Sequence, residues 1–328
     1  MELIILKTQE CAKVIENKWN RAAPIIYILI GTFLISINSL LGKTVGMNAN
    51  QIVYVRGIVM CLLGQVIANI SKVDLYGFQR DVYIKLFQRS IIGCFATLLF
   101  YTGLRYVNIA EAQVLLQTSP FWTTLIAIYY LKTETLSWKL FTNLIVGFIG
   151  IIFITQPPFL KTLLGQSVNI IKNSETQFFG CILLLFSAFF FSLVQVLINN
   201  LSNKVNQLVI PQYFGITSLI ISSIVCIIDP TLIWRNPSLI EAILLLLLGL
   251  VSYLQQIFLN RAYMKGDLTE MSMLGQTQIL YGYIFDILRG AHISYLSVLG
   301  SILIVGALFK VIMDKKKQRE KLQKELPK

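Results

Sequence analysis

Charged residues are scarce in this sequence. They make up 13% of the 328 residues, whereas 55% of the residues are hydrophobic and the mean hydropathy is +0.70. Soluble domains carry about 25% charged residues, and a single soluble core cannot bury this much apolar surface. Intrinsic disorder requires the opposite composition. The composition therefore predicts a polytopic membrane protein.

Histidine and paired cysteines are also nearly missing. His292 is the one histidine, and no CxxC pair occurs, which excludes a multi-histidine metal site, a zinc ribbon and a disulfide framework. The sequence contains no GxxxxGK[ST], HExxH or GxSxG pattern, so we expect neither ATP-driven pumping nor catalysis, and no cofactor. The five cysteines lie singly, at Cys11, Cys61, Cys94, Cys181 and Cys226.

The net charge of +12 would favour nucleic acid binding in a soluble protein. Here eight of the 28 Lys and Arg residues lie in 310–328, directly after an apolar segment. Such a basic run orients a membrane protein and contacts anionic lipid, so we expect no nucleic acid partner. The expected partners are the lipid bilayer and a small-molecule substrate, while a monomer and a homodimer both stay open.

Long apolar runs dominate the rest of the chain. Segment 1–23 is expected to lie along the cytosolic membrane surface, because its apolar patch LIIL is too short for a cleavable signal peptide. A bilayer core needs about 20 mostly apolar residues per helix, and the runs are too long for strands. The sequence predicts an all-α membrane protein with ten transmembrane helices. They span 24–42, 52–71, 90–107, 110–131, 138–157, 178–199, 208–229, 240–260, 268–288 and 293–312.

The distribution of Lys and Arg predicts the orientation. With the N-terminus inside, the inner segments hold 21 of these residues and the outer segments hold 6. Cytoplasmic loops carry the excess of positive charge. Both termini, including the basic tail 313–328, are therefore expected to be cytosolic, and loop 158–177 is expected on the other side.

The two halves of the chain resemble each other. Shifting the sequence by 157 residues superimposes the first five spans on the last five, and LKTETLSW (131–138) falls on LRGAHISY (288–295). Asn38 then meets Gln195. Because five is an odd number, the repeats 24–157 and 178–312 must run in opposite directions across the membrane, an arrangement found in secondary transporters.

One stretch resembles a known family. The run GLRYVNIAEAQVLLQTSPFWTTLIAIYYLKTETLSW (103–138) is similar to the signature of the drug/metabolite transporter superfamily, in its EamA-type branch. The second half resembles subgroup G of solute carrier family 35 through QTQILYGYIFDILRG (276–290), but it has Thr277 where a proline is common and His292 near the expected loop acid. The residues that carry the first resemblance are Ala110, Glu111, Ala112, Thr118, Pro120, Glu134, Leu136 and Ser137.

This resemblance implies ten helices and transport of small metabolites, such as amino acids, nucleobases, nucleotide sugars or other organic ions. The departures at Thr277 and His292 put acid-dependent coupling in the second half in doubt.

Polar residues form a stripe on each of two predicted helices. Polar groups inside hydrocarbon are costly, so they face a bundle interior or a cavity. We predict that the stripes line a central substrate path, with hydrogen bonding between helices as the alternative. The same helical geometry turns Gln278 about 160° away from the second stripe. The stripes comprise Gln113, Gln117, Pro120 and Thr124 in span four, and Ser272, Gln276, Tyr283 and Asp286 in span nine.

Three of the candidate residues have specific expected roles. Arg56, inside span two, is a candidate for attracting an anionic substrate; it could instead snorkel outward or pair with Glu111. Asp286 is a candidate coupling carboxylate, or a partner of Arg289 one helical turn away. Pro120 is expected to kink span four.

Together these features predict a secondary active transporter that moves a small organic solute by alternating access. Energy would come from a gradient or from exchange. An ion or solute channel is the main alternative, followed by an integral-membrane enzyme. The choice between plasma membrane and endomembrane stays open.

Overall fold

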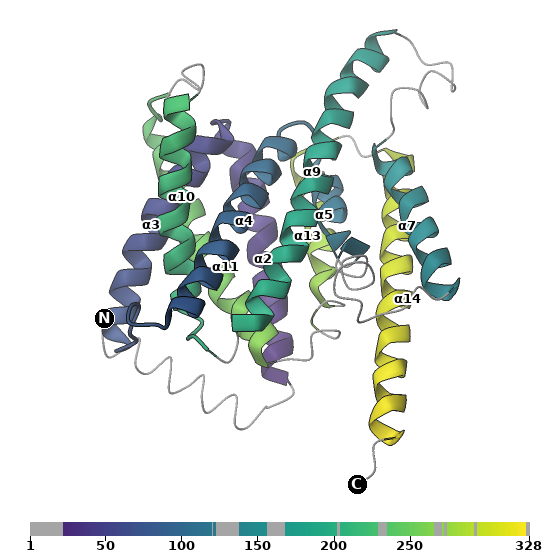
Figure 1. Ribbon diagram of the computed structural model, residues 1–328. Helices are drawn as coiled ribbons and strands as arrows, with labels where there is room; N and C mark the ends of the chain where they lie inside the picture. Colours follow the sequence, from purple (N-terminus) through teal and green to yellow (C-terminus); the bar gives the residue numbers. More distant parts are fainter. Residues whose placement is uncertain are drawn as a thin grey trace.

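The computed structural model is all-helical within the residues it describes. It describes residues 22–119, 121–122, 138–155, 168–201, 204–228, 235–265, 271, 274–291 and 294–325. Ten helices run through these segments, and none of the described residues forms a strand (Figure 1). They are α2 (Ala22–Val45), α3 (Ala49–Ile70), α4 (Arg80–Leu104), α5 (Ile109–Leu116), α7 (Trp138–Thr155), α9 (Val168–Leu201), α10 (Val209–Ile228), α11 (Leu239–Lys265), α13 (Thr277–Leu288) and α14 (Tyr295–Glu325).

Each helix overlaps one of the ten predicted spans. Six of them, α2, α3, α4, α9, α10 and α11, contain stretches long and apolar enough to cross a bilayer. The apolar parts of α7 and α14 are shorter, and α5 and α13 have 8 and 12 residues. The all-α expectation is thus confirmed for the described residues, and the chain is a multi-pass integral membrane protein.

The helix ends differ from the predicted ends in two ways. Helices α4, α9 and α14 extend beyond their apolar cores: α4 begins at Arg80 instead of residue 90. Hydropathy detects only the part of a helix that needs lipid, so polar helical extensions escape it. Conversely, α5 stops at Leu116 although the apolar run continues to 131, and α13 starts only at Thr277.

The helices pair between the two parts of the chain. Helix α2 packs along α11, α4 along α9, α3 along α10, α5 against α13, and α7 along α14. In each pair one helix lies before residue 156 and the other after residue 167. In Figure 1, α3 and α10 stand at the left and α7 and α14 at the right, with the other helices between them. The two parts of the chain therefore interlock.

Glycines allow two of these pairs to approach backbone to backbone. A Cβ atom added to Gly300 of α14 would lie 2.6 Å from the carbonyl oxygen of Gly150 in α7. A Cβ atom at Gly215 of α10 would lie 3.1 Å from the carbonyl oxygen of Gly57 in α3. Small residues at such crossings are typical of helices packed within membranes.

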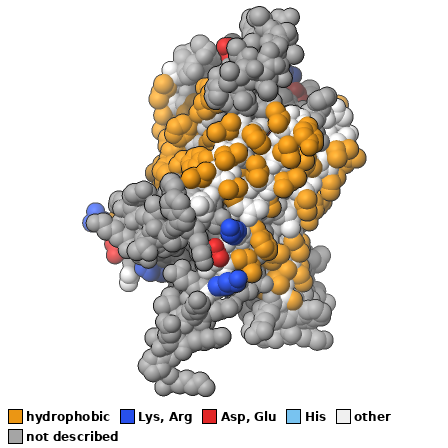
Figure 2. All heavy atoms as spheres, turned by 90° about the vertical axis from the view of Figure 1, so that its right-hand side faces the viewer, with side chains coloured by type: hydrophobic (Ala, Val, Ile, Leu, Met, Phe, Trp, Pro, Cys, Tyr) orange, Lys and Arg blue, Asp and Glu red, His pale blue; other side chains and the backbone are white. Residues whose placement is uncertain are grey.

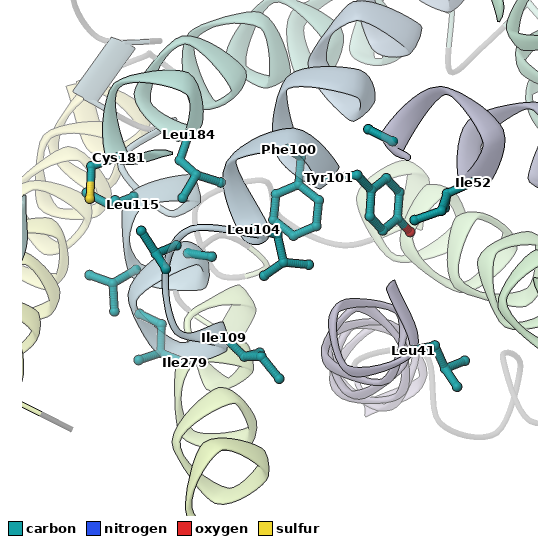
Figure 3. Close-up of a cluster of buried hydrophobic side chains, with 14 of the residues drawn as sticks. Leu41, Ile52, Phe100, Tyr101, Leu104, Ile109, Leu115, Cys181, Leu184 and Ile279 are labelled. Carbon is teal, nitrogen blue, oxygen red and sulfur yellow. The ribbon is translucent and has the colours of Figure 1, made fainter. Parts of the chain in front are cut away.

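The surface and the interior differ as a bilayer requires. Large apolar side chains such as Leu246 of α11 and Ile152 of α7 are exposed, and Figure 2 shows hydrophobic side chains over a broad band of one face. Inside, an apolar cluster joins helices from both parts of the chain. In Figure 3, Leu104, Leu115 and Leu184 come from α4, α5 and α9.

The glycine contact between α7 and α14 can be tested by adding one methyl group. Gly300→Ala should lower the stability of the protein by about 1–3 kcal/mol, because the new Cβ atom meets rigid backbone. Thermal unfolding in detergent measures the change. The control is Gly306→Ala on the same helix, where a Cβ atom has no neighbour within 4 Å and stability should be kept or raised. Equal losses in both variants would contradict the close approach.

Candidate functional site

A cavity of about 150 Å³ lies inside the bundle. At ~10–15 Å³ per water it could hold on the order of ten water molecules, a space suited to a small metabolite. Residues of α2, α3, α4, α5, α9, α10, α11 and α13 line it, whereas none of the named lining residues belongs to α7 or α14. Both parts of the chain therefore supply its walls.

Side-chain amides make up much of the polar lining. The Nδ2 group of Asn38 donates to Oε1 of Gln255, and Ser252 Oγ donates to Oδ1 of Asn38 at 3.1 Å. Two buried amide nitrogens, Nδ2 of Asn260 and Nε2 of Gln278, have no partner among the described residues. Because buried donors normally find an acceptor, these two are available to a bound solute. The lining amides are Asn38, Gln117, Gln195, Gln255, Gln256, Asn260 and Gln278.

Two interrupted helices meet at this cavity. Helix α5 ends at Leu116. In a continuing helix the carbonyl oxygen of Leu116 would accept a hydrogen bond from the backbone N–H of residue 120, and proline, which occupies that position in the sequence, has no N–H. Across the break, Nε2 of Gln117 donates to the carbonyl oxygen of Gly275 at 2.6 Å, just before α13 begins. An amide of the first part of the chain thus satisfies a backbone carbonyl of the second.

Two arginines line the same cavity. Arg56 of α3 and Arg89 of α4 are 6% and 5% exposed, and their guanidinium carbons lie 5.2 and 5.4 Å from the ring centroid of Phe214. Arg89 donates one long hydrogen bond, 3.5 Å, to Oε1 of Gln256. Its Nε and Nη1 atoms have no partner among the described residues, and neither has Nε of Arg56.

These two positive charges are not neutralised by the protein that surrounds them. No Asp or Glu occurs among the described lining residues, and the one ion pair within 4.0 Å in the described part of the chain joins Arg235 to Glu241 at the surface. A cation–π contact contributes about 0.5–2 kcal/mol, less than the several kcal/mol that burying an ion costs. The cavity therefore has a positive character that favours an anion.

The buried carboxylates lie elsewhere, at the end of the bundle where α5 begins. Asp286 of α13 accepts hydrogen bonds from the backbone nitrogens of Ile109 at 3.0 Å and Ala110 at 2.7 Å. The first turn of a helix has free N–H groups and a partial positive charge, so it stabilises this carboxylate. Asp286 and Arg289 form no ion pair within 4.0 Å.

Glu111 forms a second link at the same end. Its Oε1 accepts a hydrogen bond from Ser297 Oγ of α14 at 2.7 Å, and its Oε2 accepts weaker ones from the Asn108 nitrogen and Gln177 Nε2, both at 3.4 Å. Lys43 Nζ donates to the carbonyl of Val107 nearby. We call Glu111 and Asp286 with these partners the carboxylate layer. It joins α5 to α9, α13 and α14.

The structure brings some of the predicted site residues into the cavity wall. Arg56 and Gln117 line it. Gln113 instead contacts Ser39 Oγ at 3.5 Å between helices, and the Tyr283 hydroxyl lies 2.5 Å from Ser301 Oγ. Asp286 belongs to the carboxylate layer, and Arg56 is stacked on Phe214 instead of pairing with Glu111. Pro120, Thr124 and Ser272 lie outside the described residues.

Helix α13 contributes Gln278 to the cavity lining, whereas Gln276, which the stripe predicted, is not among the lining residues. The stripe in span nine assumed an unbroken helix with about 100° between successive residues. A turn at Gln276 separates α13, which begins at Thr277, from the helical residues 274 and 275, so positions before and after this break do not share one angular register.

Arg89 was not among the predicted site residues, because the apolar run of its span starts at Ser90. A signal was present, since Arg89, Gly93 and Thr97 are spaced four residues apart, as one helix face requires, and all three line the cavity. Gln195, which the shift by 157 residues aligns with Asn38, lines it as well.

Comparisons with known proteins agree with a transport role. Residues 22–156 match the EamA-like transporter family. The chain is 24% identical to solute carrier family 35 member G1 of Homo sapiens over 287 residues, which cover 85% of this chain and 76% of that protein. It is also 24% identical to the pseudopaline exporter CntI of Pseudomonas aeruginosa over 299 residues, covering 89% and 96%.

The fold is also similar to that of a solved crystal structure. It superimposes with a TM-score of 0.61 at 15% sequence identity, covering 91% of this chain and 99% of the other. At this identity the likeness concerns the fold alone.

The hydrogen bonds of Asp286 predict how its replacement changes the stability of the protein. Asp286→Asn should lower stability by about 1–3 kcal/mol, because an amide offers one acceptor oxygen to the two N–H groups of α5 and presents a donor to the other. Chemical or thermal unfolding in detergent measures the loss. Arg289→Gln, at an exposed position three residues away, should stay within about 0.5 kcal/mol of the parent protein. Matching losses would instead favour an Asp286–Arg289 pair.

Proposed function

We propose that this chain, which belongs to the EamA-type branch of the drug/metabolite transporter superfamily, is a secondary active transporter of a small organic solute. The observation that carries the proposal is the polar cavity at the junction of two interrupted helices. Discontinuous helices near the middle of the bundle provide backbone groups and positioned amides for a solute. The relatives described above are named as a solute carrier and an exporter.

The proposed architecture is a pair of inverted five-helix repeats. The packing supports it, because exchanging each helix for its counterpart reproduces the most extensive contacts between helices. Replacing α2 by α9 and α11 by α4 converts the α2–α11 contact into the α9–α4 contact, and both are present. The α3–α11 contact is likewise matched by α10–α4. The shared cavity lining by Asn38 and Gln195 fits the same exchange.

Alternating access would move the repeats against each other around the cavity. The carboxylate layer is the contact that must open, because Asp286 and Glu111 tie α5 to helices of the other repeat. Each link is a hydrogen bond to an ionisable side chain, and such bonds contribute about 1.5–3 kcal/mol. Because only a few bonds of this size hold the layer, the closed and open states would differ by only a few kcal/mol. A transport cycle needs two states of such similar free energy.

The proposed orientation can be checked by mapping both termini. The excess of Lys and Arg in the inner segments should place residues 1–21, loop 72–79 and the tail 313–328 on the cytosolic side. Loop 158–167 should lie on the opposite side. Accessibility of epitope tags before and after permeabilisation of the cells measures this. Termini on opposite sides would contradict the pair of five-helix repeats.

Transport itself can be tested with the full chain in proteoliposomes. Uptake of labelled metabolites from a panel of amino acids, nucleobases and organic anions should saturate, and solute loaded inside should accelerate uptake of the same solute outside. This exchange distinguishes a carrier from a channel, whose flux shows no such acceleration. Mass spectrometry of the solute should show no chemical change. Conversion of the solute, or no uptake from any member of a broad panel, would overturn the proposal.

A further inference from the structure

The charge of the cavity identifies a substrate class. We propose that the transported solute is a small organic dianion whose negative groups are held by Arg56 and Arg89. This inference rests on the proposed transport function and deepens it. It depends on three observations: the burial of the two guanidinium groups, the donors that find no partner among the described residues, and the lack of an Asp or Glu among the described lining residues.

The two guanidinium groups are held in place but are not fully used. The guanidinium carbons of both lie over the ring of Phe214, at 5.2 and 5.4 Å from its centroid. A guanidinium offers five N–H donors in a fixed fork that matches the oxygens of a carboxylate or a phosphate. Arg89 leaves Nε and Nη1 without a partner, and Arg56 leaves Nε without one. Donors without a partner among the described residues are suited to bind anionic oxygens.

The neighbourhood favours a ligand of charge −2. The two guanidinium groups share the ring of Phe214, so their positive charges lie near each other. The acids of the carboxylate layer already accept hydrogen bonds from other partners. A mononegative solute would leave one buried positive charge uncompensated, whereas a dianion neutralises both. Amide side chains such as Gln256, Asn260 and Gln278 offer hydrogen bonds to the uncharged part of the solute.

Other candidate uses of these arginines fit the structure less well. A purely structural pair would be expected to have a buried acid as its partner, and the described lining contains none. Snorkelling toward the membrane surface would expose the guanidinium groups, yet both side chains are at least nine-tenths buried. An inorganic anion would use the arginines but leave the amides of the cavity without a role.

Binding can be measured on the purified full-length protein in detergent or nanodiscs. The probes are succinate and glycerol 3-phosphate, which carry the same charge on carboxylates or on a phosphate, and inorganic phosphate. Succinamide has the size of succinate without its charge, and 1,4-diaminobutane carries the opposite charge. We expect at least one organic dianion to bind in calorimetry and to raise the thermal midpoint. Succinamide and the diamine should do neither.

Substitution of each arginine tests the assignment of residues. Arg56→Gln and Arg89→Gln should each weaken dianion binding by roughly ten- to hundredfold, because a charged hydrogen bond is lost. Without ligand, the stability of both variants should be equal to or above that of the parent, since a buried uncompensated charge is removed. Arg56→Lys and Arg89→Lys should bind about tenfold more weakly, because they keep the charge but lose the fork.

The matched control is Arg261→Gln. Arg261 also stacks on an aromatic ring, 5.4 Å from the centroid of Tyr27, but it is not among the named lining residues of the cavity. Its replacement should leave dianion binding unchanged. An equal loss in this variant would show that stacking, and not the cavity, controls the affinity.

Several results would overturn the inference and leave the transport function intact. Saturable exchange of a neutral or cationic solute without dianion binding would do so. Binding of inorganic phosphate alone would mean an inorganic anion site. If the Gln variants do not fold, unchanged dianion affinity in both Lys variants would remove the arginines from the site. Failure of the transport function is a different result, namely no exchange of any solute in the panel.

Discussion

Every backbone polar group inside a bilayer must find a partner within the protein. This constraint decides where helices α5 and α13 can be interrupted. Helix α5 ends at Leu116, four positions before a proline in the sequence, and Gln117 then donates to the carbonyl of Gly275. Such breaks are tolerated only where other helices surround them. The paired helices around α5 and α13 supply that environment, and the cavity lies among them.

The bundle separates its buried charges by position. The carboxylate of Asp286 lies in the last turn of its own helix, where a negative charge is unfavourable, but it accepts two backbone hydrogen bonds at the start of α5. Arg56 and Arg89 have no such compensation within the described protein. The acids are therefore part of the packing between helices, whereas the arginines are available for a solute.

Close glycine contacts and hydrogen bonds that can break fit the movement of the proposed transport cycle. The crossing of Gly150 with Gly300 brings two backbones together without interlocking large side chains, and the links of the carboxylate layer are hydrogen bonds that can break and reform. The cavity wall is shared between both parts of the chain. A small displacement between them would change access to the cavity while leaving the helices themselves intact.

The sequence alone determined the class of the protein and the approximate positions of its helices, because the need of apolar side chains for lipid is visible in composition and run length. It also indicated Arg56 and Gln117 as candidate residues, since isolated polar groups in apolar runs are costly, and both line the cavity. The role of Asp286, the contribution of Arg89 and the choice of Gln278 over Gln276 were decided by the tertiary structure. Helix periodicity describes one unbroken helix, whereas these three residues depend on where helices start and break and on which distant backbone or ring lies opposite.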